Sequence, residues 1–506
     1  MSRIAGSVMI STPAILDRGR VDKPDHLFDR THEWGALTAF GAAARPGASL
    51  GLVYGRRRQG KTYLLQSLIE ERGGFYWTAL SQSSQQNLDR LAADYAAFTG
   101  QRAGSRFDDW SQAFTALLAL GEGRDEPITV VVDEFPYLLD GDAALPSILQ
   151  ALLAPRGEAV RRWKTSLILC GSALTTMQGL LTASAPLRGR ASLELFVHPF
   201  GYRDAARFWE VSSRPATAMR LHALVGGTPA YRLMAGHQAP GDDAEFDAWV
   251  EQALLDPASA MFREGQALLA DEIRPSDRAL YTAVLVAIAS GRTRRGEIAA
   301  TLGRSEGALA HPLNALVAAR LVEPAADALR QKRTTFRLAE PMLRFHHLVI
   351  EPNEAQLARG RGPALWRSLQ DTVSSRIYGP HFEHLARTWC LEHAEEATLG
   401  GTALSVAATT VACRTHRSGH ELDVVVAAGP AGDARRVVAI GEAKWRAEPC
   451  DVAHLERLEH ARDVLGAVGA RLLLFSRSGF TRGLHAAARR RGDVELIDLE
   501  RLYRGS

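Results

Sequence analysis

The stretch Gly55-Arg56-Arg57-Arg58-Gln59-Gly60-Lys61-Thr62 has the complete spacing G-x-x-x-x-G-K-[ST]. An apolar run at 49–54 precedes it, and 62–71 has the apolar spacing of a helix. A strand, a glycine-rich turn and a helix in this order predict a loop whose backbone N–H groups bind phosphate at the N-terminus of the helix. We expect Gly55 and Gly60 to shape the loop, Lys61 to contact the β- and γ-phosphates and the Thr62 hydroxyl to hold Mg²⁺.

A second buried strand with acids at its end is expected downstream of such a loop. The β-branched run 128–132 ends in Asp133-Glu134, as expected for a strand that is buried on both faces. We predict that Asp133 supports hydrated Mg²⁺ and that Glu134 orients and deprotonates the attacking water. An acidic pair in this place often caps a helix instead, but the phosphate loop upstream favours catalysis.

Two further segments carry polar groups that could belong to the same site. The apolar run 166–170 leads into Ser172, which could sense the γ-phosphate or cap the next helix. Arg190, at the end of Pro186-Leu187-Arg188-Gly189-Arg190, could act as an arginine finger. It could equally be a solvated arginine of a surface loop.

Several motifs together resemble the archaeal-type ATPase family, which belongs to the signal-transducing branch of the AAA+-like P-loop ATPases. They are Phe28-Asp29-Arg30-x-x-Glu33, Asp133-Glu134-Phe135-Pro136-Tyr137-Leu138, Leu169-Cys170-Gly171-Ser172, Pro186-Leu187-x-Gly189-Arg190 and Gly226-Gly227-Thr228-Pro229-Ala230-Tyr231. The resemblance covers about the first 350 residues. It implies that ATP is the ligand, that Phe28 and Arg30 lie against the adenine and that 226–231 belongs to a helical lid. Three consecutive arginines at 56–58 depart from the pattern and leave nucleotide selectivity open.

A winged helix-turn-helix is predicted next. Helices are expected at 276–289 and over two segments within 294–316, and the wing strands at 320–323 and 335–338. The expected wing tip carries Arg330, Lys332 and Arg333, and the second helix offers Arg304, Ser305 and His311 for contacts with DNA. In the related ATPases this module also serves as a packing or regulatory joint, and the sequence does not separate the two roles.

The C-terminal region predicts a second reaction centre. Strand-like runs contain Asp423 and, further on, Glu442-Ala443-Lys444. Because side chains alternate along a strand, Glu442 and Lys444 share a face, and a hairpin partner can bring Asp423 opposite them. Two carboxylates could hold Mg²⁺ or Mn²⁺ against a scissile phosphate, and Lys444 could orient water. Glu383, on a preceding helix, could add a third carboxylate.

This arrangement resembles the PD-(D/E)xK nuclease superfamily, and the block 474–481 resembles the end of the domain that is often fused behind this ATPase family. The resemblance covers roughly residues 365–506 and implies DNA as the substrate. The pattern D-x(n)-E-x-K is short, so a degenerate binding domain and a coincidental match stay open. All four residues of the predicted site are present.

The composition of the chain restricts the classes of protein to which it can belong. The 506 residues are 46% hydrophobic and 23% charged, with a net charge of only +3, which does not by itself indicate a nucleic-acid partner. The four cysteines are too scattered to predict a zinc site or disulfides, and this usage fits the reducing cytoplasm. No apolar run approaches the ~20 residues of a membrane helix, so we expect no membrane span.

The predicted fold is α/β throughout its two larger domains. Five segments are expected: a P-loop ATPase domain with a parallel sheet at 1–212, a helical lid at 213–272, the winged helix-turn-helix at 273–350, a linker at 351–364 and an α/β nuclease-like domain at 365–506.

The sequence thus predicts a Mg²⁺-dependent ATPase switch coupled to a DNA-directed nuclease-like domain, with a second copy or another protein as a possible partner. The alternatives are a nucleotide-gated regulator or scaffold with a non-cleaving C-terminal domain, and a DNA-binding transcriptional regulator.

Overall fold

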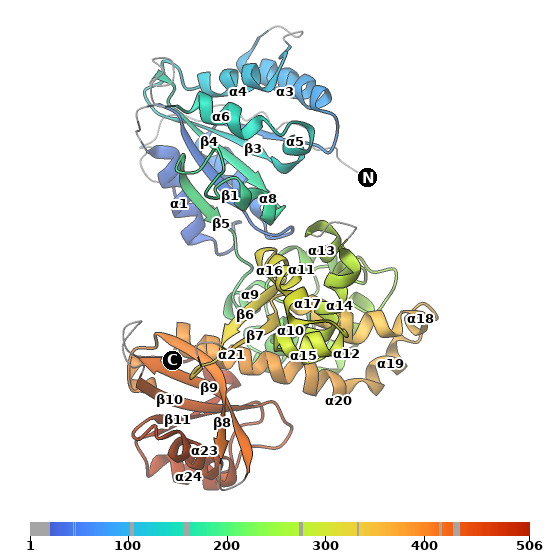
Figure 1. Ribbon diagram of the computed structural model, residues 1–506, viewed down its shortest axis with the longest axis vertical. Coiled ribbons are helices and arrows are strands. Elements are labelled where there is room, and N and C mark those ends of the chain that lie inside the picture. The colour runs from blue at the N-terminus through green and yellow to red at the C-terminus, as the bar shows by residue number, and fades with distance from the viewer. Residues whose placement is uncertain are drawn as a thin grey trace. The chain divides into compact units, whose positions relative to one another are not determined.

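Figure 1 shows the computed structural model of the protein. The structure describes residues 21–43, 45, 47–101, 106–154, 162–272, 277–330, 333–413, 417–428 and 436–506. The chain divides into two compact units, Met1–Pro199 and Phe200–Ser506. Each unit is described by itself. Lys332, predicted at the wing tip, lies outside the described residues.

The N-terminal unit is built on a parallel sheet of five strands in the order β2-β3-β4-β1-β5. The strands are β1 (Ser49–Tyr54), β2 (Phe75–Thr78), β3 (Ile128–Asp133), β4 (Thr165–Gly171) and β5 (Ala191–Phe196). The central strands β3 and β4 are buried along their whole length, which explains their continuous apolar sequences. The predicted parallel sheet is confirmed.

Helices cover both faces of this sheet (Figure 1). They are α1 (Thr31–Ala42), α2 (Lys61–Arg72), α3 (Ser84–Thr99), α4 (Trp110–Ala119), α5 (Pro136–Gly141), α6 (Leu145–Leu152) and α8 (Leu174–Gly179). Because neighbouring side chains of a strand point to opposite faces, Val131 packs in one core with residues of α1 and α2. Val130 and Val132 pack in the other core with residues of α3, α4 and α6.

The C-terminal unit begins with a helical region. Its helices are α9 (Tyr202–Phe208), α10 (Pro215–Val225), α11 (Ala230–Met234), α12 (Asp243–Ala253) and α13 (Glu264–Glu272). One continuous apolar core joins these helices to the rest of the unit, and it includes Trp209, Trp366 and Phe475. The region predicted as a lid therefore belongs to the same packed body as the C-terminal sheet.

Three α-helices, with a 3₁₀ turn between the second and the third, and a two-stranded sheet follow in the order expected of a winged helix. They are α14 (Arg278–Ala289), α15 (Arg295–Thr301), a 3₁₀ turn (Glu306–Leu309), α16 (Ala310–Ala318), β6 (Val322–Ala326) and β7 (Thr334–Leu338). Strands β6 and β7 pair antiparallel. The turn between them contacts the C-terminal sheet, because Ala328 donates its N–H to the Ala408 carbonyl at 3.1 Å and Thr409 donates to Asp327 at 2.8 Å.

Residues 351–364, expected as a linker, are largely helical. The chain runs through α17 (Pro341–Phe345), a π-helix (His346–Ile350), a 3₁₀ turn (Glu351–Asn353), α18 (Glu354–Leu357), α19 (Gly362–Ser368), α20 (Gln370–Val373) and a second π-helix (Ser374–Tyr378). Pro352 and Pro363 occupy first-turn positions, where proline starts a helix without losing a hydrogen bond. Leu357 and Gly362 are buried while most other residues of 351–364 are exposed, so the segment is anchored to the unit at these two positions.

The C-terminal sheet is mixed and has the order β12-β11-β10-β9-β8. Its elements are α21 (Gly379–Glu392), α22 (Glu396–Leu399), β8 (Ser405–Cys413), β9 (Ser418–Ala428), β10 (Arg436–Lys444), α23 (Val452–Leu465), β11 (Arg471–Ser476), α24 (Arg482–Arg489), β12 (Val494–Asp498) and α25 (Leu499–Arg504). Strands β8, β9 and β10 pair antiparallel, whereas β10, β11 and β12 pair parallel. Residues of α21 pack with Val424 and Phe475 on one face, and residues of α23 pack with Leu472 and Leu474 on the other.

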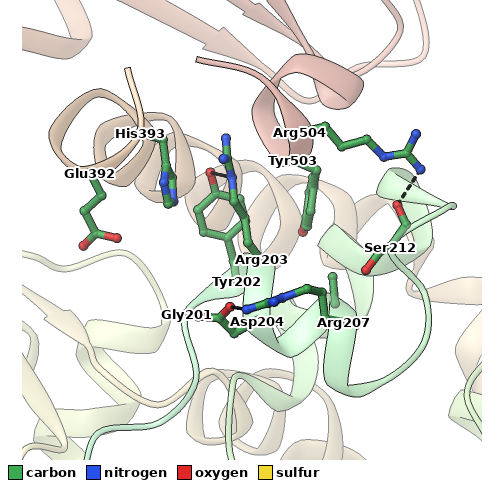
Figure 2. Close-up of a pocket in the computed structure, with 11 residues that line it drawn as sticks. Gly201, Tyr202, Arg203, Asp204, Arg207, Ser212, Glu392, His393, Tyr503 and Arg504 are labelled. Atoms are coloured by element: carbon green, nitrogen blue, oxygen red, sulfur yellow. Dashed lines mark hydrogen bonds and ion pairs between the residues drawn. The ribbon is translucent and has the colours of Figure 1, made fainter. Parts of the chain in front are cut away.

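The end of the chain returns to α9, where a cavity of about 350 Å³ lies between α9, the end of α21 and α25 (Figure 2). The Tyr202 hydroxyl donates to the Leu502 carbonyl at 2.8 Å, and Arg504 donates to the Ser212 carbonyl at 2.9 Å. These bonds fasten α25 to α9 and to the loop that follows it.

Candidate functional site

The predicted phosphate loop leads from β1 into α2. Gly55 has no room for a side chain, because a Cβ there would lie 2.6 Å from the Val197 carbonyl oxygen. Gly60 is the N-cap of α2 and has φ +85°, a conformation that favours glycine. The two glycines thus place the N–H groups of the first turn of α2 at the mouth of the loop, where the helix dipole favours an anion.

Lys61 lies within the curve of this loop. Its side chain is almost wholly buried, and Nζ donates to the carbonyl oxygens of Gly55 at 2.8 Å and Arg56 at 2.9 Å. The ammonium is therefore held at the centre of the loop, which is the position from which a lysine can reach a bound phosphate.

Asp133 and Thr62, both predicted to serve Mg²⁺, lie within hydrogen-bond distance of each other. Thr62 Oγ1 donates to Asp133 Oδ2 at 2.8 Å, and Tyr76 on β2 donates its hydroxyl to the same oxygen at 2.6 Å. Adjacent oxygen ligands of octahedral Mg²⁺ lie ~2.9 Å apart, given bonds of 2.0–2.1 Å. The donor set and spacing of Thr62 and Asp133 therefore fit Mg²⁺.

Glu134 follows Asp133 in an unusual conformation, with φ 51°. Ser172 Oγ donates to Glu134 Oε2 at 3.1 Å, while α8 begins after Ala173 and has no side-chain cap. Ser172 therefore holds Glu134 rather than capping a helix. The strained backbone and this hydrogen bond together aim the carboxylate across the carboxyl edge of the sheet.

Arg30 supports the phosphate loop from outside. Its guanidinium donates to the Gln59 carbonyl at 3.0 Å and pairs with Glu33 at 2.9 Å, and the side chain is buried. Phe28 is half-buried two residues earlier. The resemblance implies contact of both residues with adenine. The structure shows Arg30 bracing the loop.

Arg190 is the predicted residue that the structure does not bring to this site. It immediately precedes β5, and β5 runs parallel to β1 with Ala191 opposite Leu50 and Phe196 opposite Tyr54. The phosphate loop follows Tyr54, so Arg190 and the loop lie at opposite ends of the sheet, separated by about five strand residues, or ~16 Å. Arg190 cannot serve as an arginine finger for the site of its own chain.

The C-terminal acids also meet at a strand end. Lys444 Nζ lies 2.6 Å from Glu442 Oε1, and Asp423 Oδ2 accepts a hydrogen bond from the Ala443 N–H at 2.9 Å. The antiparallel pairing of β9 with β10, in which Gly441 is opposite Val424, brings these residues together. The two predicted strands thus pair as a hairpin that brings Asp423 beside Glu442 and Lys444.

Glu383 lies beside this group on α21, which packs on the same sheet. Burial, and then the charge of Asp423, raise the pKa of Glu383 to about 7. Burial also raises the pKa of Asp423, against the lowering effects of the Ala443 N–H and Lys444. Crowded, partly desolvated carboxylates of this kind are oxygen donors that suit Mg²⁺ or Mn²⁺.

The four predicted residues are neighbours without forming a tight ligand cluster. Among the described residues, two groups of three or more His, Cys, Asp or Glu have all ligand atoms within 4.8 Å of one another, and neither contains Glu383, Asp423 or Glu442. At most two of these three carboxylates therefore lie close enough to share an ion in this conformation.

Two functional side chains were missed by sequence reasoning. Tyr76 bonds Asp133 across neighbouring strands, which no local motif reveals; burial and the Asp133 charge raise the pKa of its phenol, so it stays a donor. Arg387 donates to the Asp423 carbonyl at 2.8 Å. It lies one helical turn after Glu383, so an i, i+4 search from that residue could have found it.

The predicted DNA-contacting residues of the winged helix differ in setting. Arg304, Ser305, His311 and Arg330 are exposed. Arg333 instead lies 3.8 Å from Asp327, the residue of the wing that Thr409 of β8 contacts. One side of the wing is therefore occupied by the C-terminal sheet.

Comparisons with known proteins bear on the first of these sites. Residues 27–231 match the model of an ATPase domain found predominantly in Archaea. An uncharacterized protein of Methanocaldococcus jannaschii is 24% identical over 318 residues, which cover 61% of this chain and 66% of that protein. Within the part of the chain that the structure describes, no helix has the length and apolar character to cross a bilayer.

Among solved structures, the Walker-type ATPase PABY2304 of Pyrococcus abyssi is similar with a TM-score of 0.46 and 20% identity, covering 63% of this chain and 96% of that one. The ORC2 protein of Aeropyrum pernix, in its ADPNP–ADP complexes, is similar with a TM-score of 0.40 and 16% identity, covering 66% and 96%. The phosphate loop, the parallel sheet and the family match agree: residues 27–231 are an archaeal-type P-loop ATPase domain.

Proposed function

We propose that this protein is a Mg²⁺-dependent, ATP-hydrolysing switch whose C-terminal domain is a metal-dependent nuclease acting on DNA. The observation that carries the second half is the convergence of Asp423, Glu442 and Lys444 at one strand end, with Glu383 beside them. Carboxylates beside a lysine are the residue types that metal-dependent phosphodiester hydrolysis uses.

In the ATPase domain, Lys61 and the N–H groups of the first turn of α2 bind the phosphates. Thr62 and Asp133 would hold Mg²⁺, which would supply charge stabilisation at the phosphates. Glu134 accepts the proton of the attacking water, and Ser172 fixes its carboxylate. The loop also carries the positive charge of Arg56, Arg57 and Arg58, which leaves its selectivity among nucleotides open.

In the C-terminal domain, Asp423 and Glu442 would hold Mg²⁺ or Mn²⁺, with Glu383 as a further ligand. The ion supplies charge stabilisation at the scissile phosphate and a more acidic water. Lys444 orients that water and stabilises the charge on the phosphate oxygens. Arg387 keeps α21 against β9 through the Asp423 carbonyl.

Contacts inside the C-terminal unit connect α10, in the region predicted as a lid, to this site. His222 Nδ1 on α10 lies 2.9 Å from His381 Nε2 on α21, two residues before Glu383. Burial lowers the pKa of His222 to about 4 and that of His381 well below its usual value, so both rings are neutral and one donates to the other. A shift of α10 would therefore move α21, and Glu383 with it.

A second copy of the chain is the partner we infer for Arg190. Since this residue lies at the far end of the sheet from its own phosphate loop, it can assist hydrolysis only in a neighbouring subunit. Loss of ATP hydrolysis in Arg190→Ala, restored on mixing with Lys61→Ala protein, would support this arrangement. A full rate in Arg190→Ala would contradict it.

DNA cleavage tests the proposed nuclease. Purified protein is incubated with ATP, Mg²⁺ or Mn²⁺, and duplex, single-stranded or branched DNA. We expect cutting by the unaltered chain and none by Asp423→Asn, with ATP hydrolysis within twofold in both. Equal cutting by the two proteins would assign the activity to a contaminant or to another site.

The alternative function is a nucleotide-gated regulator or scaffold whose C-terminal domain binds without cutting. Two observations favour it: the three carboxylates do not form a tight ligand group, and the wing is docked on β8. Absence of cleavage under all these conditions, together with DNA binding that weakens on Arg304→Ala, would favour a regulator that uses the exposed side of its winged helix.

A further inference from the structure

We propose that Cys413, His420 and His460 form a binding site for a divalent transition-metal ion of the zinc class. Their ligand atoms all lie within 4.8 Å of one another, and Cys413 Sγ is 3.3 Å from His460 Nε2. The site is separate from the proposed nuclease centre, because it contains none of Glu383, Asp423, Glu442 or Lys444.

The fold brings these residues together from three elements. Cys413 is the last residue of β8, and His420 lies on β9, where its direct partner is Val411. Cys413 is two residues beyond Val411, so it shares a face of the hairpin with His420. Helix α23 packs against the C-terminal sheet, with Val411 beside its buried leucines, and supplies His460.

The distances suit tetrahedral coordination. With Zn–S of 2.3 Å and Zn–N of 2.0–2.1 Å, a sulfur and a nitrogen ligand lie ~3.6 Å apart, and two nitrogen ligands ~3.4 Å apart. The observed separation of 3.3 Å between Cys413 and His460 differs from the first value by a few tenths of an ångström. The rings of His420 and His460 have centroids 5.1 Å apart at 76°, which lets both present a nitrogen to one point.

The donor set selects the metal. One thiolate and two imidazoles are softer ligands than the oxygens that Mg²⁺ prefers, and they suit Zn²⁺ and its neighbours in the first transition row. Cys413 is 4% exposed, so its thiol is poorly placed to attack a substrate. His420 and His460 are only half-buried, which leaves an ion a path to the site and a fourth position for water.

A metal here would fasten the β8–β9 hairpin to α23. His420 lies three residues before Asp423 on β9, so the ion would also hold the strand that carries the proposed nuclease carboxylate.

Metal content of the untagged, full-length protein tests the site. The protein is stripped with a chelator, dialysed against Zn²⁺ with excess Mg²⁺ to occupy oxygen sites, and measured by mass spectrometry. We expect about one zinc per chain. Replacement by Co²⁺ should give a sulfur-to-metal charge-transfer band and the strong visible bands of tetrahedral cobalt.

The variants Cys413→Ser, His420→Gln and His460→Gln should each weaken zinc binding by on the order of 100-fold. His485→Gln, an exposed histidine of the neighbouring helix α24, is the matched control and should bind as the unaltered chain does. If Cys413→Ser does not fold, the cobalt spectrum of the unaltered chain and the two histidine variants decide the matter.

Three results would overturn the proposal: less than about a tenth of an ion per chain, a cobalt spectrum without a thiolate band, or undiminished binding in the histidine variants. Loss of zinc on His346→Gln, with binding retained in His460→Gln, would assign the ion to the second histidine-containing group, His346, His347 and Glu351, and would also overturn it.

Discussion

Two sites of the chain use similar chemical groups but assemble them differently. One is the phosphate-loop site, and the other is the strand-edge site, which consists of Glu383, Asp423, Glu442 and Lys444. Of 60 basic residues only five are lysines, and each site contains one of them, Lys61 or Lys444. At the loop, two glycines, the lysine and the hydroxyl lie within eight consecutive residues. At the strand edge, Glu383, Asp423 and Glu442 come from a helix and two strands.

This difference determines how sensitive each site is to structural shifts and how easily it is predicted from the sequence. The loop is specified by local backbone geometry, with Gly60 in a left-handed conformation and Lys61 bonded to the loop's own carbonyl oxygens. The strand-edge site depends on the register of β9 with β10 and on the docking of α21. Small shifts of these elements can separate its carboxylates, whereas the loop retains its shape.

The largest expected effect is that of Lys61→Ala on ATP hydrolysis. Removing the ammonium from the centre of the loop should lower turnover by roughly 1,000-fold or more, because charge on the transferred phosphoryl loses its partner. Lys61→Arg should fail as well, since the guanidinium is too bulky for this position. Lys164→Ala is the control: Lys164 bonds the Asp125 carbonyl, away from the loop, and its loss should leave phosphate release unchanged.

Next in size is the effect of Glu134→Gln. Loss of the general base should slow hydrolysis by about 100-fold or more, while binding of a fluorescent ATP analogue is retained. Ser172→Ala should cost about tenfold, because it removes only the hydrogen bond that orients Glu134. If Ser172→Ala slowed turnover as much as Glu134→Gln, the hydroxyl would be contacting the nucleotide itself.

Lys444→Arg should reduce DNA cleavage by about tenfold and leave ATP hydrolysis unaltered. The guanidinium keeps the charge beside Glu442 but does not reproduce a compact ammonium. Paired measurement of phosphate release and DNA cleavage makes this a direct comparison of the two lysines. If Lys444→Arg slowed both phosphate release and DNA cleavage, Lys444 would also be needed for ATP hydrolysis.

The smallest effect concerns Glu383 and the pH dependence of stability. Its pKa is about 7 in the fold against an ordinary 4.5, so the folded state binds the proton more tightly than the unfolded chain does. The stability linked to this proton is fully present below about pH 4.5 and is lost as pH rises through 7. Glutamine carries no proton that is lost over this range. The free energy of unfolding of Glu383→Gln, minus that of the unaltered protein, should therefore be larger at pH 8 than at pH 5 by on the order of 1–3 kcal/mol.

Urea unfolding at the two pH values measures this difference, with Glu456→Gln, an exposed residue of α23, as the matched comparison. An equal effect of Glu383→Gln at pH 5 and pH 8 would show that the carboxyl is not crowded. Added Mg²⁺ should stabilise the unaltered protein more than the variant at pH 8.

The sequence predicted those features that depend on short segments. The loop and the strand that ends in Asp133 follow from consecutive residues and the rules of parallel sheets. The alternation along β10 likewise placed Glu442 and Lys444 together. Tyr76, Arg387 and the docking of the wing on β8 depend on which elements become neighbours, and no local pattern encodes that choice.

Arg190 and Cys413 both show that spacing in the sequence does not by itself place a side chain in a site. The family motif around Arg190 suggested a catalytic role, but strand direction places it at the far end of the sheet. The scattered cysteines indicated no zinc site, yet pairing of β8 with β9 and packing of α23 bring Cys413 to two histidines. In both cases the direction and pairing of the strands determine where the side chain lies.

DNA cleavage by Lys61→Ala in the presence of ATP and Mn²⁺ tests whether the two sites are coupled. We expect that cleavage by the unaltered protein changes when ATP is added and that this response disappears in Lys61→Ala, whose strand-edge site is intact. The same response to ATP in both proteins would contradict it.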